Sequence, residues 1–310
     1  MRRRTRSSEK VLFGAYAPPA PASGLQPIDD LSRALNRQLD IVLWYQQWAG
    51  WGARANSAWL TMVTQTRRKP VVTWEPWKPG SADQPRFRLA RIAAGDFDTY
   101  IEAWGKSLRA FGKPVFLRLM HEMNGNWYPW GGSANGNAPS DFVAAWHRVH
   151  AIFEAVGAMN VRWVWCPLAE DVPAKACNRF ELYYPGARFV DVLALDGYNW
   201  GSTFPEHGGW RSFDSIFSSA YGRIIELGPQ PVWVAETASA SEGGEKAAWV
   251  REMFASVGNY PRLRAIIWFH AQKERDWRAT SPAAAAAAFA SDDDCAARHQ
   301  VSSCLSGVRR

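Results

Sequence analysis

Two glutamates directly follow apolar runs of the sequence and are the residues best placed for acid–base chemistry. Glu122 comes after residues 116–121, and Glu236 comes after residues 232–235. Three large aromatic residues follow the first glutamate: Trp127, Tyr128 and Trp130. A carboxyl group that exchanges protons beside stacking rings is the arrangement needed for chemistry on a glycosidic bond. A glutamate follows an apolar run twice in this sequence, which disfavours the alternative that each is an incidental residue at a structural strand end.

Eight short apolar runs recur along the chain and predict strands over residues 11–17, 40–45, 70–74, 114–120, 161–166, 189–195, 231–235 and 264–269. Amphipathic stretches predict helices over residues 28–39, 57–67, 97–111, 140–156, 213–227, 242–257 and 282–290. The runs lack polar alternation, which is typical of parallel strands covered on both faces. We therefore predict a single α/β domain, a (β/α)8 TIM barrel. A doubly wound open sheet is the alternative, but no Gly-rich phosphate turn follows the first run.

Charge and hydropathy exclude two classes of partner. The net charge is +7, and most of it lies in residues 1–10 and in Arg309 and Arg310. We therefore expect a disordered basic N-terminal tail over residues 1–10, and a catalytic barrel with a short C-terminal extension over residues 11–310. No apolar run reaches the roughly 18 residues that cross a bilayer. Neither nucleic acid nor a membrane is expected as a partner.

Polar residues gather at the predicted carboxyl ends of the strands, where barrels of this kind place their active sites. These ends are residues 44–48, 74–77, 121–124, 196–200, 236–237 and 268–270. Strands four and seven lie opposite each other in an eight-stranded barrel, so we expect Glu122 and Glu236 to approach over the central pocket. Retaining glycosidases need two carboxyl groups ~5–5.5 Å apart.

Other chemistries fit the sequence less well. A zinc-protease motif starting at His121 would need a histidine at the position of Gly125. The sequence has no Gly-x-Ser-x-Gly elbow and no Walker loop. We predict no cofactor and no metal, although a metal site from scattered Asp, His and Glu side chains stays open.

The tryptophans and cysteines carry further information. The chain has 18 Trp, many of them at predicted strand ends where flat rings can grip sugars, while others fill the core. The cysteines leave two alternatives open: disulfides Cys166–Cys177 and Cys295–Cys304, which would suit an oxidising compartment, or four free thiols.

Residues 118–125, Arg-Leu-Met-His-Glu-Met-Asn-Gly, and the aromatic residues after them resemble glycoside hydrolase family 26. The best-known members of that family are endo-β-1,4-mannanases, and the likeness covers residues 11–290. The resemblance implies a (β/α)8 barrel with the acid/base after strand four and the nucleophile after strand seven. It therefore implies that Glu122 is the acid/base and that Glu236 is the nucleophile.

Several more residues are predicted to bind substrate: His121, Trp127, Tyr198, Trp268, Asn124, Glu75, Trp77, Trp130, Arg118 and Asp196. The resemblance implies that Trp268 is the platform under the reactive sugar and that Tyr198 hydrogen-bonds the nucleophile. Arg118 shares the strand parity of Glu122, so we expect it to hold a carboxylate ionised, with a structural ion pair as the alternative. Glu75 is expected to bind a sugar hydroxyl, against a purely structural role.

The sequence thus predicts a retaining endo-β-glycosidase acting on a polysaccharide or oligosaccharide, with β-1,4-mannan as the first substrate. Mixed-linkage β-1,3-1,4-glucan and β-1,3-xylan are alternatives within the family, and a non-catalytic glycan-binding barrel or an accessory protein beside a glycan synthase lies outside it. We expect a groove lined by four tryptophans: Trp44, Trp48, Trp77 and Trp130. A monomer is expected. Its substrate predicts a secreted or periplasmic location, although no signal-peptide segment is visible.

Overall fold

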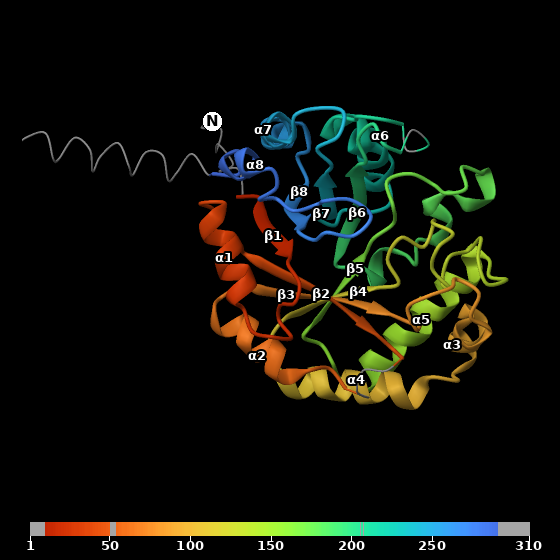
Figure 1. The fold of residues 1–310 in the computed structure, drawn as a ribbon. Helices are drawn as coiled ribbons and strands as arrows, with labels where there is room; N and C mark the ends of the chain where they lie inside the picture. The colour runs from red at the N-terminus through yellow and green to blue at the C-terminus, as the bar shows by residue number, and fades with distance from the viewer. Residues whose placement is uncertain (1–9, 50–53, 205, 207, 291–310) are drawn as a thin grey trace, which may run out of the picture.

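The computed structural model describes residues 10–49, 54–204, 206 and 208–290 (Figure 1). The predicted tail, apart from Lys10, and the predicted extension with Cys295 and Cys304 lie outside these residues. The strands are β1 (Leu12–Tyr16), β2 (Ile41–Gln47), β3 (Lys69–Glu75), β4 (Val115–Leu119), β5 (Val161–Trp165), β6 (Val192–Asn199), β7 (Val232–Ser239) and β8 (Leu263–Phe269). They pair in parallel, in sequence order, into a closed barrel, which confirms the predicted (β/α)8 fold.

Helices cover the outside of the barrel (Figure 1). They are α1 (Gln26–Ala34), α2 (Ser57–Gln65), α3 (Leu89–Ala94), α4 (Asp98–Phe111), α5 (Pro139–Ala155), α6 (Phe213–Ile225), α7 (Lys246–Ser256) and α8 (Ala283–Ala287). Short 3-10 turns are η1 (Pro85–Phe87), η2 (Ala176–Asn178), η3 (Phe180–Tyr183), η4 (Ala187–Phe189) and η6 (Val257–Asn259). Among the described residues, no helix combines the length and the apolar character needed to cross a bilayer.

The structure corrects several predicted boundaries. Helix α3 was not predicted, because it is six residues long and ends at Gly95, which has a φ of 99°. Strands β6 and β7 run four residues beyond the apolar runs 189–195 and 231–235. Their polar ends still pair with each other, from Asp196 with Glu236 to Asn199 with Ser239. Hydrophobicity therefore marks the buried part of each strand, whereas backbone pairing carries the strand on into the site.

Alternate side chains of each strand face the barrel interior or the helices. Ile41, Leu43 and Val71 belong to the inner cluster. Val42 and Trp44 belong to the larger cluster between the sheet and the helices. This parity decides which strand-end side chains can reach the mouth of the barrel.

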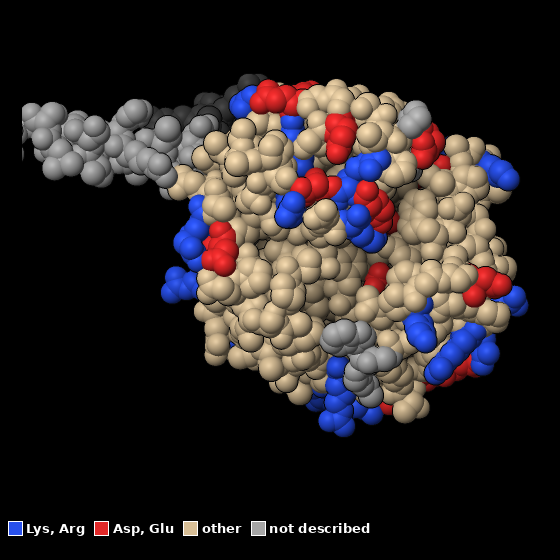
Figure 2. All heavy atoms as spheres, viewed as in Figure 1, with Lys and Arg blue, Asp and Glu red and all other residues tan. Residues whose placement is uncertain are grey.

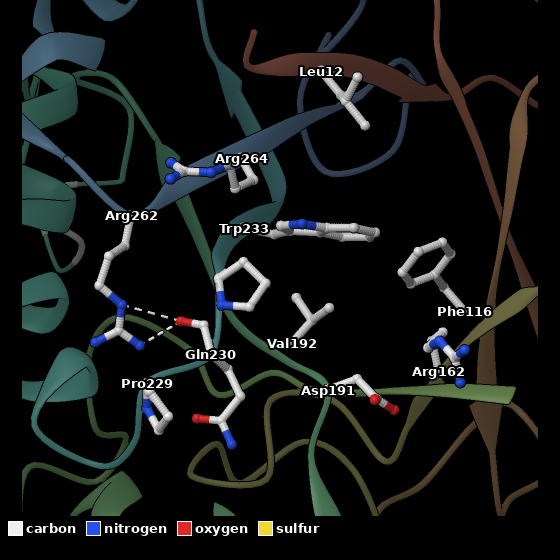
Figure 3. A pocket seen from close by; sticks show the side chains of 11 residues that line it. Leu12, Phe116, Arg162, Asp191, Val192, Pro229, Gln230, Trp233, Arg262 and Arg264 are labelled. Carbon is white, nitrogen blue, oxygen red and sulfur yellow. Dashed lines mark hydrogen bonds between the residues drawn. The ribbon is translucent and has the colours of Figure 1, made fainter. Parts of the chain in front are cut away.

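A hollow of about 580 Å³ lies at the amino ends of the strands (Figure 3). Trp233 and Phe116 pack together inside it, with ring centroids 4.7 Å apart. Arg262 at its edge donates from Nε to the backbone carbonyl oxygen of Gln230 at 3.1 Å, and it also donates to Ile225 and Gly228 carbonyls. This end of such a barrel serves stability, and the polar chemistry gathers at the opposite end.

Candidate active site

Glu236 lies at the carboxyl end of the barrel and accepts hydrogen bonds on both carboxylate oxygens. Tyr198 donates its hydroxyl hydrogen to Oε2 at 2.6 Å. Arg118 donates from Nη2 to Oε1, forming an ion pair in which both side chains are buried. A guanidinium and a phenol that donate together stabilise the ionised carboxylate. The predicted contact of Tyr198 with this carboxylate is therefore present.

A β-bulge turns Glu236 into the barrel. Trp233 and Ala235 belong to the inner cluster, so strict alternation would point Glu236 toward the helices. The register of β7 shifts between Val234 and Thr237 against β8, and a corresponding shift occurs against β6. Such a bulge places two residues opposite one and re-aims the following side chain.

Arg118 on β4 connects the nucleophile candidate to a second buried carboxyl group. Its Nη1 donates to Asp196 Oδ2 at 2.7 Å, and its Nε donates to Thr73 Oγ1 at 2.9 Å. Cys166 donates its thiol hydrogen to Asp196 Oδ1 at 3.0 Å. Both Arg118 and Asp196 are fully buried. Arg118 therefore pairs with two buried carboxyl groups, and its fully buried side chain does not reach substrate, which corrects its predicted place among the substrate-binding residues.

Asp196 does not bind substrate as predicted, because its side chain is inaccessible and already bonded to Arg118 and Cys166. Burial raises the pKa of Asp196 well above its usual range, against the lowering effect of the Arg118 charge.

Cys166 is a free buried thiol and Cys177 is a free exposed one, so the Cys166–Cys177 disulfide is not formed.

Replacing Arg118 with Met is expected to destabilise the fold by about 3–5 kcal/mol, because it leaves Asp196 and Glu236 buried without their cation. The free energy of unfolding is measured by urea denaturation. Arg33→Met, which removes an exposed ion pair with Asp30, is the matched control and is expected to cost less than about 1 kcal/mol. Equal stabilities of the two variants would contradict this account of Arg118.

Glu122 follows β4 in a tight backbone conformation. Its φ is 51°, and that of Met120 is 48°, both in the left-handed region that non-glycine residues adopt at a cost. The Glu122 amide donates to the Cys166 carbonyl oxygen at 2.7 Å. Trp127 donates from Nε1 to Glu122 Oε2 at 2.9 Å. This turn directs the Glu122 carboxyl group away from the strand, where the indole N–H of Trp127 donates to it.

The two glutamates have different surroundings, because Glu236 is paired with Arg118 and Glu122 is not. Burial, followed by the charge of Glu236, raises the pKa of Glu122 to about 8. Glu122 is thus protonated at neutral pH, whereas Glu236 is paired with a cation. A protonated carboxyl group beside an ionised one provides a proton donor and a nucleophile in one cavity. Figure 2 shows a hollow in the surface of the molecule, with atoms of Asp or Glu side chains inside it.

His121 immediately precedes Glu122 in the sequence and lies close to the nucleophile candidate in space. Its Nε2 is 4.0 Å from Glu236 Oε1, and its Nδ1 has no hydrogen-bond partner among the described residues. Burial lowers the pKa of His121, so the imidazole is neutral. A neutral buried ring with an unsatisfied nitrogen fits the predicted role in binding sugar.

His121, Asp196 and Glu236 also hold ligand atoms within 4.8 Å of one another, as a metal site would. The guanidinium of Arg118 already bonds one oxygen of each carboxylate. A cation bound there would face this positive charge. The cluster is better suited to its arginine than to a metal ion.

The predicted aromatic residues divide into exposed and buried ones. Trp127 is 37% exposed beside Glu122, and Trp77 is half-buried. Trp130 is fully buried and donates from Nε1 to the His121 carbonyl oxygen at 2.6 Å. Tyr128 stacks on Trp130 at 4.3 Å and is the half-exposed ring of the pair. Trp130 therefore supports the wall of the site without forming its surface.

Two other predicted groove residues, Trp44 and Trp48, are buried in the outer core. The structure also contradicts the platform role of Trp268. This side chain is fully buried against Trp249 and Phe289. It belongs to the outer cluster, while Ala265 and Ile267 on the same strand belong to the inner one.

Phe269, one residue after Trp268, has the inward parity. Its ring lies 6.0 Å from that of Tyr198 and 4.9 Å from that of Tyr16. Tyr16 in turn contacts Tyr45 at 4.9 Å. These aromatic residues were not predicted, because the prediction of sugar-binding rings rested on the tryptophans at the strand ends. Strand parity is the sequence signal that finds them.

Asn124 is a scaffold residue, which corrects its predicted contact with substrate. Its Nδ2 donates to the carbonyl oxygens of Leu168 and Glu170, and its Oδ1 accepts from the Leu168 amide at 2.8 Å. Nδ2 also donates to Asp171 Oδ1 at 3.0 Å. These bonds join the loop after β4 to the loop after β5 and so fix the turn that carries Glu122.

Glu75 and Gln47 end neighbouring strands and pair side by side. They are in register between β3 and β2, and Gln47 donates from Nε2 to Glu75 Oε2 at 2.6 Å. Burial is the largest influence on Glu75 and raises its pKa to about 7. Gln47 was not predicted, although it has the same parity as Tyr45. The charge of Lys273, an exposed residue in the loop after β8, acts to lower the pKa of Glu122. No sequence pattern predicted this residue.

The sequence model of Glycosyl hydrolase family 26 matches residues 87–277, which is more than half of the chain. The chain belongs to glycosyl hydrolase family 26. Endoglucanase H of Acetivibrio thermocellus is 35% identical over 277 residues, which cover 86% of this chain and 29% of that protein. A mannan endo-1,4-beta-mannosidase of Bacillus subtilis strain 168 is 32% identical over 94 residues, which cover 28% of this chain and 24% of that protein. The matched segments span less than a third of each of these two proteins.

Among solved structures, the Bacillus subtilis mannanase BCman superimposes with a TM-score of 0.64 and 18% sequence identity. The match covers 92% of this chain and 85% of that one. At this identity the likeness shows the shared fold alone.

Proposed function

We propose that this protein is a retaining endo-β-glycosidase. The observation that carries the proposal is the contrast between two carboxyl groups that lie close enough for the charge of one to act on the other. Glu122 is buried beside Trp127 with a pKa of about 8, while Glu236 is bonded by Arg118 and Tyr198. Double displacement requires this pair of opposite protonation states.

In the proposed reaction Glu236 attacks the anomeric carbon while Glu122 gives its proton to the departing glycosidic oxygen. The C–O bond to the leaving sugar breaks, and a glycosyl ester forms on Glu236. Glu122, now ionised, takes a proton from water, and the water oxygen displaces Glu236. Two inversions at one carbon leave its β-configuration unchanged. Tyr198 and Arg118 hold the attacking carboxylate in place.

The pH dependence of turnover follows from Glu122. A carboxyl group with a raised pKa is protonated below that pKa, so the active form is present below pH about 8 and is lost as pH rises through it. We expect kcat/KM on an oligosaccharide, which reports the pKa of the free enzyme, to fall tenfold for each pH unit above about pH 8. Glu122→Gln should abolish this limb along with most of the activity. A wild-type basic limb near pH 5 would contradict the assignment.

The comparisons support two substrates for different reasons. Four matched relatives are named mannan endo-1,4-beta-mannosidases, which favours the predicted β-1,4-mannan. The likeness to Endoglucanase H extends over 86% of this chain, which favours a β-glucan as the second candidate. Both are β-linked hexose polymers, and the catalytic residues serve either.

The test is reducing-end release from galactomannan, glucomannan and barley mixed-linkage glucan, with Glu122→Ala and Glu236→Ala as blanks. Release from the mannans alone establishes a mannanase, and release from the barley glucan alone establishes a glucanase with the same catalytic residues. Release from none of them, or equal release by the blanks, would refute the proposed function for these polymers.

We propose further that the protein works outside the cytoplasm, because polymeric substrates do not cross a cell membrane. We also propose that it is a monomer. Cell fractionation tests the first statement, and sedimentation velocity tests the second.

A further inference from the structure

The segment that joins β8 to α8 packs against the tyrosine that holds the nucleophile candidate. We call residues 270–279 of this segment the β8 loop. Its Trp277 is 1% exposed, and the ring of this residue lies 5.1 Å from that of Tyr198. Tyr198 donates to Glu236 Oε2 at 2.6 Å. The position of Trp277 therefore limits where the Tyr198 hydroxyl lies, because close-packed rings do not shift separately.

The same loop places a cation near both glutamates. The charge of Lys273 opposes the raising effect of burial on the pKa of Glu122. Burial acts to lower the pKa of Lys273, but its hydrogen bond with Glu274 and the charges of the two catalytic glutamates raise it. The β8 loop thus acts on the site through one ring and one charge.

Buried side chains hold three successive carbonyl groups of the β8 loop. Lys246, the first residue of α7, donates from Nζ to the carbonyl oxygens of Asp276 at 2.9 Å and Arg278 at 3.2 Å. Trp268 donates from Nε1 to the carbonyl oxygen of Trp277, which lies between them in the chain, at 2.8 Å. Both donor side chains are buried. These bonds fix the backbone at Trp277 and, with it, the direction of the ring.

Lys246 is a costly residue if its role is stability alone. Burying an ammonium group is unfavourable, and the N-terminus of a helix carries a partial positive charge that adds to the cost. Burial lowers the pKa of Lys246 to about 8, against the raising effects of the Asp276 and Glu242 charges. Both of the hydrogen bonds described above go to neutral carbonyl oxygens. An apolar side chain of similar volume would avoid this cost. What Lys246 supplies is the fixed position of the loop.

We infer that Lys246 is a positioning residue for the catalytic pair and acts through the β8 loop. Its ammonium group holds the loop, and the loop in turn holds Trp277 against Tyr198 and places Lys273 near Glu122. The inference rests on the proposed function and adds Lys246 to the residues on which turnover depends. The buried side chain of Lys246 touches no substrate.

The test compares two cations that hold backbone carbonyl groups at opposite ends of the barrel. Lys246→Met removes the ammonium group and keeps the length of the side chain. Arg262→Met is the matched control, because Arg262 donates to three carbonyl groups at the amino end, away from the site. Trp268→Phe removes the donor to Trp277 and is the second loop variant, in case the Lys246→Met protein does not fold. Thermal melting shows which proteins are folded.

The first readout is the titration of Glu122 without substrate. Carbon-13 NMR of the glutamate carboxyl groups follows it, with the resonance assigned by the Glu122→Gln variant. We expect the midpoint to rise by at least about 0.3 of a pH unit in both loop variants, because a loosened loop takes the Lys273 charge away from the carboxyl group. The Arg262→Met protein should keep the wild-type midpoint.

The second readout is turnover on the polysaccharide from which the wild type releases reducing ends. Both loop variants should lower kcat about tenfold and change KM by less than about twofold, because a misplaced Tyr198 misaligns the attacking carboxylate while the binding surface remains. The Arg262→Met protein, assayed where it is folded, should keep the wild-type kcat.

Two results overturn the inference alone. One is a wild-type kcat or an unchanged Glu122 midpoint in the folded loop variants, and the other is an equal loss of kcat in the folded Arg262→Met protein. Absence of reducing-end release by the wild type overturns the proposed function instead. In that case the Glu122 titration still decides whether the loop acts on the site, and an unchanged midpoint then overturns the inference as well.

Discussion

Replacing Glu236 with Ala is expected to lower kcat by at least about 10⁴-fold on every substrate. The carboxylate forms the covalent intermediate, so no step of double displacement survives its loss. The fold should persist, because Arg118 keeps its ion pair with Asp196. Initial rates and thermal melting measure the two effects on one preparation.

Azide provides the matched control for this loss. The ion can occupy the space left by the carboxylate and attack the anomeric carbon once, while Glu122 still protonates the leaving oxygen. The expected product is the α-glycosyl azide, with a partly restored rate. A folded Glu236→Ala protein that retains wild-type turnover without azide would sink the assignment of the nucleophile.

Replacing Glu122 with Ala is expected to lower kcat by about 10³-fold on polysaccharide, because the leaving oxygen then departs without its proton. The loss should shrink to a few-fold for the first step with a dinitrophenyl glycoside, whose leaving group needs no protonation. Burst kinetics separate that step from hydrolysis of the intermediate.

Glu102→Ala, an exposed residue paired with Lys106, is the control for Glu122→Ala and should match the wild type. With azide the Glu122→Ala protein should yield the β-glycosyl azide, the opposite anomer to that of the Glu236 variant. An equal loss of rate on the dinitrophenyl glycoside and on polysaccharide would contradict a role in proton transfer.

The barrel and the positions of the two glutamates at strand ends were predictable because each rests on a local pattern. Apolar runs marked the buried parts of all eight strands, and Glu122 and Glu236 stood where two of those runs ended. The inward direction of Glu236 was not predictable from alternation, since it depends on the β-bulge after Val234. Pairing against two neighbouring strands creates that bulge, and no single segment encodes it.

The binding residues were predicted less well, because residue type alone does not say which face a side chain occupies. Trp268 is the larger ring, but Phe269, in register with Tyr16, is the one whose ring lies 6.0 Å from that of Tyr198. Asp196 and Asn124 sit in the right motifs, but their side chains serve Arg118 and the neighbouring loop. Gln47 needed the register between β2 and β3 before its bond to Glu75 could be inferred.

The most direct test of the central claim is the configuration of the first product. Proton NMR of a reaction mixture, recorded before mutarotation, shows which anomer of the new reducing end appears first. Double displacement through Glu122 and Glu236 predicts the β-anomer. The α-anomer appearing first would mean a single displacement by water and would contradict the assignment of Glu236 as a nucleophile.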